Sequence, residues 1–322
     1  MKLALLGTGM IVQELLPVLA ELGIRPRALL GTERSRERTA ELAARFGIEG
    51  VYFRYEALLE DSGADTVYVG LPNALHFDYA RRALLRGLHV IVEKPAVPTL
   101  AEFLELRRLA EERGLILLEA MTIPHQPAFR QMVEDVRRLG AVRTAILNYS
   151  QYSSRYDAFL QGTVAPAFDP GQAGGALMDL NVYNLHLALH LFGPPETAHY
   201  QASVRRGIDT SGVLTLGYPD KTVACIGAKD CQGANFSCIQ GEAGRMEIAQ
   251  PVSFASGYEL VFRSGVRERR ETPRPRHRLS YEFEAFREIL DGSRMDRVSE
   301  LLDVSEAAAR ILETARKQAW SL

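Results

Sequence analysis

Short apolar runs alternate with amphipathic stretches over the first 120 residues. The apolar runs carry little polar alternation, which is typical of strands buried on both faces of a parallel sheet. Between them, apolar residues recur at helical spacing, and the connecting loops are short. This order predicts right-handed crossovers and a doubly wound parallel sheet. The strands are expected at 2–6, 27–31, 66–69, 88–92 and 115–118, and the helices before Gly23 and at 34–46, 76–86 and 100–113.

The second half of the chain has a different pattern. An amphipathic helix is expected at 129–139, a strand at 142–152, and a long helix from about 176 to 192. Between 198 and 270, β-rich runs follow one another without helices, which argues for an antiparallel sheet. The remaining elements are expected as strands at 213–217, 222–226, 235–239, 245–248 and 258–262, an exposed loop and edge strand at 263–278, and helices near 279–290 and 304–320.

Composition narrows the class of protein. A chain of 322 residues, 47% hydrophobic and 24% charged, can hold two globular domains. Its net charge of −2 gives no electrostatic footprint for nucleic acid or an anionic membrane. The chain starts directly with a strand, without a signal peptide, and no apolar run approaches a membrane span. The three cysteines lack CxxC spacing, and their odd number fits a reducing compartment. We therefore expect a cytoplasmic protein.

A glycine-rich turn joins the first strand to the first helix. Gly7-Thr8-Gly9 supplies two glycines of the dinucleotide-binding fingerprint, which allow a tight turn and close approach of a pyrophosphate. The third glycine is replaced by Val12, so looser packing between helix and strand is expected. In this strand–turn–helix context the motif predicts nucleotide binding.

The end of the second expected strand bears on the choice of cofactor. Glu33 is the best match to the acid that bonds a ribose 2′-hydroxyl in NAD, whereas an arginine such as Arg34 can accept the 2′-phosphate of NADP. The pattern leans weakly towards NAD. Alternatively, both side chains simply belong to the solvated first turn of the next helix.

Two buried strands end in polar tips. One continues into Leu71-Pro72-Asn73 with His76 shortly after, and the other, Val90-Ile91-Val92, into Glu93-Lys94-Pro95. In open α/β sheets, ligands bind in the crevice beyond the carboxyl ends of the strands, so both tips are candidates for a site. The alternative for Lys94 is a surface lysine before a helix-starting proline.

The helix expected from about 176 follows Gly174-Gly175 and carries a polar stripe. Asp179, Tyr183, His186 and His190 are spaced to share one helical face. Such a stripe must reach solvent or line a wet pocket. The two histidines imitate a helical zinc motif, but the adjacent glutamate and a third ligand are missing, so no metal is expected. His186 is expected on a pocket wall and His190 in a structural role.

Together these motifs resemble, in order and spacing, the glucose–fructose oxidoreductase, inositol dehydrogenase and MocA (Gfo/Idh/MocA) family. The resemblance covers nearly the whole chain. It implies an α/β protein with an N-terminal Rossmann domain, here 1–120, and a C-terminal α+β domain, here 121–322, with an open, mostly antiparallel sheet. It also implies an NAD(P)-dependent dehydrogenase or reductase that acts on CH–OH groups of sugars, polyols or dihydrodiols. The matching motifs are Gly7-x-Gly9, Pro72-Asn73-x-x-His76, Val92-Glu93-Lys94-Pro95 and Gly174-Gly175-x-x-x-Asp179.

The departures from the family pattern concern the residue that transfers the proton and the residues that bear on the choice of substrate. The usual histidine four residues after the aspartate is Tyr183 here, which is similar to the subgroup that contains dihydrodiol dehydrogenase. Glu119-Ala120-Met121 also resembles that subgroup, but Pro124 stands at about the place of an arginine that it often carries. The substrate and the direction of the reaction therefore stay open.

The resemblance implies roles for individual residues. Lys94, Tyr183 and Asp179 are the expected catalytic residues. An unperturbed tyrosine titrates near pH ~10, so Tyr183 needs a nearby cation to act as base or acid, and Lys94 is a source of that charge. Asp179 would hold a substrate hydroxyl or orient Lys94. Alternatively, Lys94 alone handles the proton. Cofactor contacts are expected from Gly7, Thr8, Gly9, Met10, Ile11, Glu33, Arg34, Leu71, Pro72, Asn73, His76, Glu93 and Lys94, and substrate contacts from Lys94, Asp179, Tyr183 and His186.

Two further expectations concern the class of protein and its partners. A non-enzymatic dinucleotide sensor or regulator on the same fold is the alternative function, although the retained Lys94, Asp179 and Tyr183 argue for an enzyme. An open sheet covered by helices on one side leaves an apolar face, which predicts a dimer or higher homo-oligomer. Neither nucleic acid nor a membrane is expected as a partner.

Overall fold

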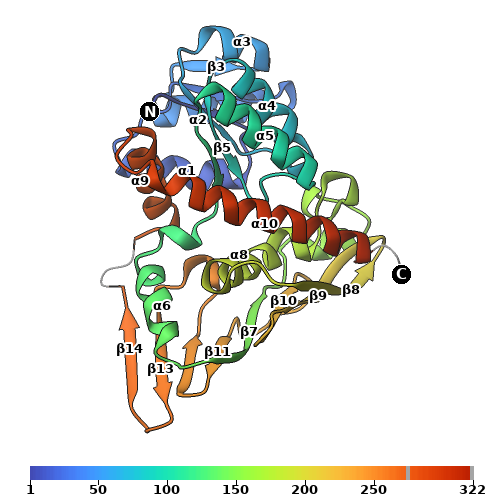
Figure 1. Ribbon diagram of the computed structural model, residues 1–322. Helices are drawn as coiled ribbons and strands as arrows, with labels where there is room; N and C mark the ends of the chain where they lie inside the picture. Colours follow the sequence, from blue (N-terminus) through green and yellow to red (C-terminus); the bar gives the residue numbers. More distant parts are fainter. Residues whose placement is uncertain (273–275, 320–322) are drawn as a thin grey trace. The chain divides into compact units, whose positions relative to one another are not determined.

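The computed structural model describes residues 1–272 and 276–319. By its contacts the chain divides into two compact units (Figure 1). The first comprises Met1–Ala120 with Leu279–Asp303, and the second comprises Met121–Arg278 with the chain from Val304 on. Trp320, the expected end of the last helix, and residues 273–275 of the expected loop lie outside the described residues.

One segment corrects the expected domain boundary. A single division after residue 120 assigns Leu279–Asp303 to the second domain, whereas this segment packs with the first unit. The reason is its apolar face: Leu279, Phe283 and Phe286 lie in the core of the first unit, and the ring of Phe283 lies 5.6 Å from that of Tyr68.

The first unit is the predicted parallel sheet with helices. Its six strands are all parallel, in the order β3-β2-β1-β4-β5-β6. The short strand β3 and the helix α3 are absent from the sequence-based expectation, because their burial pattern is mixed and their runs are brief. The strands are β1 Leu3–Leu6, β2 Ala28–Leu30, β3 Gly50–Tyr52, β4 Thr66–Val69, β5 His89–Glu93 and β6 Leu117–Ala120. The helices are α1 Met10–Glu21, α2 Arg36–Phe46, α3 Tyr55–Asp61, α4 His76–Leu85, α5 Leu100–Arg113 and α9 Arg278–Leu290.

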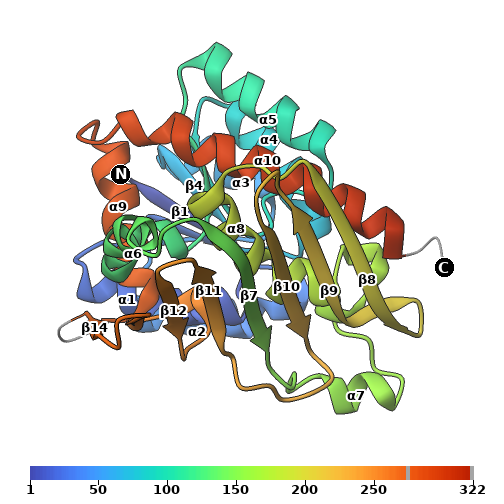
Figure 2. The same cartoon turned by 60° about the horizontal axis from the view of Figure 1, so that its bottom comes forward.

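The second unit contains the predicted open sheet (Figure 2). Its eight strands run in the order β14-β13-β12-β11-β7-β10-β9-β8, and every neighbouring pair is antiparallel except β7 with β10. β8 lies between the expected elements and is missing from the prediction, whereas the edge strand β14 is confirmed. The strands are β7 Val142–Ser150, β8 Thr197–Arg205, β9 Ile208–Gly217, β10 Thr222–Ala228, β11 Ser237–Gly241, β12 Gly244–Ile248, β13 Gly257–Phe262 and β14 Arg267–Glu271.

Helices cover one face of this sheet. Residues of α6, α8 and the second part of α10 share an apolar core with alternate residues of the strands, such as Leu214 and Leu216 of β9. On the other face Ile146 and Val213 are exposed. The helices are α6 Pro127–Arg137, α7 Tyr156–Leu160, α8 Val182–Phe192 and α10 Asp296–Ala319, whose first eight residues, 296–303, belong to the first unit.

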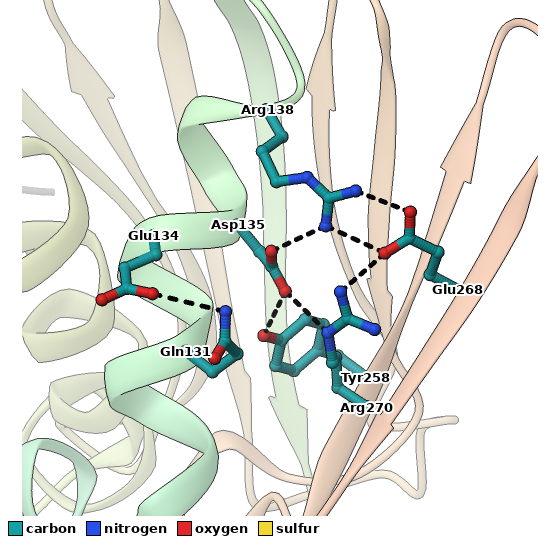
Figure 3. A network of polar contacts seen from close by, with 7 residues as sticks. All are labelled: Gln131, Glu134, Asp135, Arg138, Tyr258, Glu268 and Arg270. Carbon is teal, nitrogen blue, oxygen red and sulfur yellow. Dashed lines mark hydrogen bonds and ion pairs between the residues drawn. The ribbon is translucent and has the colours of Figure 1, made fainter.

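A polar network ties α6 to the edge of the second sheet (Figure 3). Asp135, 1% exposed, accepts hydrogen bonds from Tyr258 Oη at 2.9 Å, Arg138 at 2.9 Å and Arg270 Nε at 3.1 Å. The carboxylate of Glu268 in β14 accepts hydrogen bonds from the guanidinium groups of both arginines. Burial acts to raise the pKa of Asp135, but the hydrogen bonds from Arg138 and Tyr258 and the charge of Arg270 outweigh it and lower this pKa below its usual range.

Asp135→Asn should lower the free energy of unfolding of the second unit by about 1–3 kcal/mol at neutral pH, because two arginines and a tyrosine lose a buried acceptor. A lowered carboxyl pKa contributes stability above the unfolded value of about 4, and this contribution disappears as the pH falls through the folded value. The gap between wild type and variant, measured by calorimetry, should therefore narrow in acid. Glu134→Gln, which changes the exposed neighbour of Asp135, is the matched control, and an equal loss in both variants would contradict the role of the network.

Candidate active site

The glycine turn of the first unit leaves open space at the start of α1. Gly7 has φ +104°, and a Cβ there would lie 2.6 Å from the carbonyl oxygen of Gly70, so only glycine fits. Gly9 is exposed and is the N-cap of α1, and a Cβ on it would meet nothing within 4 Å. A helix N-terminus presents backbone N–H donors and a positive dipole end to anions. The turn therefore fits a pyrophosphate, with Thr8 buried and Met10 and Ile11 at least partly exposed beside it.

Val12 corrects the expectation of looser packing. Its side chain is fully buried, and its Cγ2 lies 2.8 Å from the position that a Cβ of Gly70 would take. The space that the motif usually gains from a third glycine on the helix is provided by a glycine after β4 instead. The helix therefore packs closely despite the valine.

The loop after β2 holds its acid and one arginine in an ion pair. Both carboxylate oxygens of Glu33 accept hydrogen bonds from Arg36, at 2.6–3.0 Å, and the Arg36 guanidinium lies 4.0 Å from the ring centre of Phe53. Arg34 is exposed, and within residues 1–272 and 276–319 its guanidinium makes no hydrogen bond or ion pair. Because Arg36 neutralises the charge of Glu33, the uncompensated charge of this loop is the positive charge of Arg34.

His76 connects the two strand tips of the first unit. It is 1% exposed, with Nδ1 at 3.0 Å from the Pro95 carbonyl oxygen and Nε2 at 2.8 Å from that of Leu71. Burial lowers the pKa of His76, although both hydrogen bonds favour the charged ring. Because both nitrogens face backbone carbonyls, its effect on a bound cofactor is indirect, through the placement of the two tips. Pro72 and Asn73 beside it are partly exposed.

Glu93 and its partners shape the loop that carries Lys94. Glu93 is 8% exposed, and its Oε1 accepts a hydrogen bond of 2.5 Å from the Tyr68 hydroxyl. Its Oε2 accepts a hydrogen bond from the backbone N–H of Lys94 at 3.2 Å, and the N–H of Ala96 donates to Glu119. Glu93 therefore holds the loop, while Lys94 itself is partly exposed.

In the second unit, Asp179 lies in a π-helical turn, Leu177–Asn181, that precedes α8. The wider turn corrects the expected single polar stripe, because the four residues no longer follow one α-helical spacing. Asp179 Oδ2 lies 2.8 Å from the Nζ of Lys229, and its side chain is 34% exposed. Lys229 is a residue that sequence reasoning missed: it stands 50 positions from Asp179, and only its place after an apolar strand marks it.

Of the rest of the expected stripe, Tyr183 and His186 are buried and His190 is half-buried. Every residue from Val182 to Leu189 is buried, including Tyr183 at 7% and His186 at 1%. The Tyr183 ring lies 5.8 Å from that of Tyr149. Burial lowers the pKa of His186 to about 3, so its ring is neutral at physiological pH. This argues against the expected place of His186 on a wet pocket wall.

Asp209 of β9 fixes the start of the π-helical turn. It is 4% exposed, and its Oδ2 accepts hydrogen bonds from the Leu177 N–H at 2.7 Å and the Tyr200 hydroxyl at 2.8 Å. A Cβ on Gly175, at φ +111°, would lie 1.9 Å from Asp209 Oδ1, so the glycine allows the carboxylate to approach. Burial raises the pKa of Asp209 to about 6, although its hydrogen bonds and the charge of Lys229 oppose the shift.

Two kinds of feature are not found in the part of the chain that the structure describes. No three side chains among its His, Cys, Asp and Glu are arranged to hold a metal ion. No helix there combines the length and the hydrophobicity that a membrane span needs.

Comparison with known proteins identifies the family. Residues 1–121 match the oxidoreductase family with an NAD-binding Rossmann fold, Gfo/Idh/MocA, and residues 128–247 match a C-terminal domain of that family. The scyllo-inositol 2-dehydrogenase (NADP(+)) of Bacillus subtilis (strain 168) is 31% identical over 319 residues, which cover 98% of this chain and 96% of that protein. The trans-1,2-dihydrobenzene-1,2-diol dehydrogenase of Macaca fascicularis is 28% identical over 298 residues, 88% of this chain and 86% of that one.

A solved structure supports the same fold. A 3-ketoreductase from Actinomadura kijaniata, in complex with NADP and TDP-benzene, superposes with a TM-score of 0.87 at 24% identity, covering 99% of this chain and 98% of that one. The predicted combination of a Rossmann sheet with an open antiparallel sheet is thereby confirmed. The chain belongs to the Gfo/Idh/MocA family and is an oxidoreductase that uses NAD(H) or NADP(H).

Proposed function

We propose that the protein transfers a hydride between NADP(H) and a hydroxyl-bearing or carbonyl carbon of a sugar, a polyol or a dihydrodiol-like molecule. The names of the relatives support this class, since one acts on an inositol and another on a ring diol. The observation in this chain that carries the proposal is the open space beside Gly9 at the N-terminus of α1. The alternative of a sensor without catalysis is not favoured, because these relatives are named as dehydrogenases.

The nicotinamide, when bound, supplies the hydride chemistry, and the chain must supply the proton transfer. Tyr183 carries the proton at its hydroxyl, as base in oxidation and as acid in reduction. Lys94 supplies the positive charge that lets a tyrosine act near neutral pH. Asp179 accepts a hydrogen bond from a substrate hydroxyl. His186 has no part in this transfer because it is buried and neutral.

NADP replaces the weak expectation of NAD. The Bacillus relative is named for NADP(+), and the reductase structure contains NADP. In this chain the Glu33 carboxylate is engaged by Arg36, while Arg34 presents an exposed cation near the end of β2. A 2′-phosphate suits that cation, and the hydroxyls of Thr32 and Ser35, 3.1 Å apart, add donors beside it.

Self-association through the outer face of the second sheet also belongs to the proposal. Val213 of β9 pairs with Ile226 of β10, and Ala224 of β10 pairs with Ile146 of β7. These four residues, the outer patch, form one apolar surface across three adjacent strands, and Ile146 is 40% and Val213 37% exposed. A second copy of the chain is a suitable cover for such a surface.

For the cofactor, Arg34→Ala should weaken NADP binding by roughly 10–100-fold, because a charge-assisted hydrogen bond contributes about 1.5–3 kcal/mol. NAD binding should change little, since the ribose hydroxyl does not require the cation. Titration calorimetry with both cofactors measures the difference. Arg38→Ala removes the same charge from an exposed position further along α2 and should leave the NADP preference intact. Equal effects of the two variants, or tighter NAD than NADP binding in wild type, would contradict the assignment.

For the proton, a panel of sugars, polyols and diols is first screened by the absorbance of the reduced cofactor. On the best substrate, Tyr183→Phe should lower kcat by roughly 10²–10⁴-fold with cofactor binding retained. Lys94→Ala should cost at least as much, and the two losses should not add because both residues serve one transfer. Tyr149→Phe removes a hydroxyl from the neighbouring ring as a control. Near-normal turnover and an unchanged pH profile in Tyr183→Phe would exclude Tyr183 as the proton carrier.

For the assembly, Val213→Lys should shift a wild-type dimer or higher oligomer towards monomer in sedimentation velocity, because it places a charge within the outer patch. Val164→Lys makes the same substitution at a residue outside this sheet, 52% exposed, and should leave the oligomer intact. A wild-type protein that is monomeric at micromolar concentration removes this part of the proposal.

A further inference from the structure

Lys229 is a buried lysine that none of the preceding roles uses. It follows the last residue of β10, and its side chain is 2% exposed. Lysine is rarely buried to this extent unless its charge is paired. Its Nζ lies 2.8 Å from Asp179 Oδ2, donates to the Ala167 carbonyl oxygen at 2.7 Å, and lies 4.3 Å from the ring centre of Phe168. The ammonium is therefore held by a carboxylate, a carbonyl and an aromatic face.

The sheet fixes where this ammonium can lie. The Lys229 N–H donates to the Thr210 carbonyl oxygen at 2.8 Å, and its own carbonyl accepts from the Ser153 N–H at 2.9 Å. The backbone of Lys229 thus continues the β10–β9 pairing beyond Ala228, opposite the residue that follows Asp209. A side chain anchored in this way has little freedom to follow a moving partner, so Asp179 must adapt to Lys229 rather than the reverse.

The π-helical turn is consequently fixed at two points from the same end of the sheet. Asp209 accepts from the Leu177 N–H at the first residue of the turn, and Lys229 binds the Asp179 side chain two residues later. The same ammonium also binds Ala167 of the loop before Gly174-Gly175. One buried charge therefore sets both the direction of the carboxylate and the position of the loop next to it.

We infer that Lys229 is a positioning residue for the reaction: through its ion pair it holds the Asp179 carboxylate in the one direction in which this group accepts a hydrogen bond from a substrate hydroxyl. This inference rests on the proposed function. Because the side chain of Lys229 is almost fully buried while that of Asp179 is 34% exposed, Lys229 acts through Asp179 and does not itself contact the substrate. Asp179 serves as a fixed hydrogen-bond acceptor rather than as a proton carrier.

The test compares Lys229→Met with Lys221→Met. Lys221 precedes the opposite end of β10, pairs with Asp220 and lies 5.2 Å from the ring centre of Tyr218, so it is a lysine in a similar setting away from Asp179. Each rate is divided by the concentration of cofactor-binding sites, measured by titration, so that unfolded protein does not lower the value. Lys229→Met should raise the substrate KM at least 5-fold and lower kcat/KM by roughly 10–100-fold, with NADP affinity within about 3-fold of wild type. Lys221→Met should match wild type in all three quantities.

A double variant separates positioning from folding. Lys229→Met removes the buried cation that pairs with Asp179, whereas Lys229→Met with Asp179→Asn removes both charges of this pair and should recover much of the lost thermal stability. If Lys229 acts only through Asp179, the double variant should have the same kcat and KM as Asp179→Asn alone. This comparison holds even if the single Lys229→Met variant fails to fold.

The outcomes are distinct. An unchanged KM and kcat per site in Lys229→Met would leave Lys229 a purely structural residue and overturn the inference. A double variant that is tenfold or more slower than Asp179→Asn would also overturn it, because Lys229 would then act independently of Asp179. A wild-type protein that turns over no member of the substrate panel contradicts the proposed function itself, and the positioning role falls with it.

Discussion

Polar groups buried in the interior must be paired, and the loops of the candidate site are held in place by such pairs. In the first unit, Tyr68 binds the Glu93 carboxylate and His76 lies between the carbonyls of Leu71 and Pro95. In the second, Asp209 binds the Leu177 N–H and Lys229 binds Asp179. Because an unpaired buried charge is far more costly than a poor surface contact, each pair determines the backbone around it. The positions of the residues that the proposed chemistry requires are thus set by the buried polar pairs behind them.

The fold could be predicted from the sequence because periodicity records burial on a local scale. Strands such as Thr66–Val69 and Val90–Val92 are buried within the parallel sheet, and this burial is visible in the sequence as uninterrupted apolar runs. The placement of Leu279–Asp303 in the first unit could not be predicted in the same way. An amphipathic helix such as α9 shows that it buries one face, but its sequence does not say against which sheet.

The candidate site was accessible to sequence reasoning only as far as motifs reach. Gly7, Gly9 and Lys94 lie in short local patterns, whereas the pair of Asp179 with Lys229 joins residues 50 positions apart. The compensation of Val12 by Gly70 is hidden for the same reason, since it needs the register of β1 and β4. The expectation of NAD rests on the identity of Glu33, whereas the ion pair with Arg36 leaves this carboxylate less able to accept a hydrogen bond from a ribose hydroxyl. The type of a side chain can be read from the sequence, whereas the groups that it contacts depend on the folded structure.

The division of the chain into units has a consequence for the order of events during translation. The first 120 residues leave the ribosome long before α9, whose residues Leu279, Phe283 and Phe286 complete their core, because the 158 residues of 121–278 are made in between. At typical rates of synthesis this interval is roughly 10–30 s. During it the apolar surface that α9 covers in the folded unit stays exposed. The nucleotide turn is therefore made well before α9, the helix that completes the core of the unit that contains the turn.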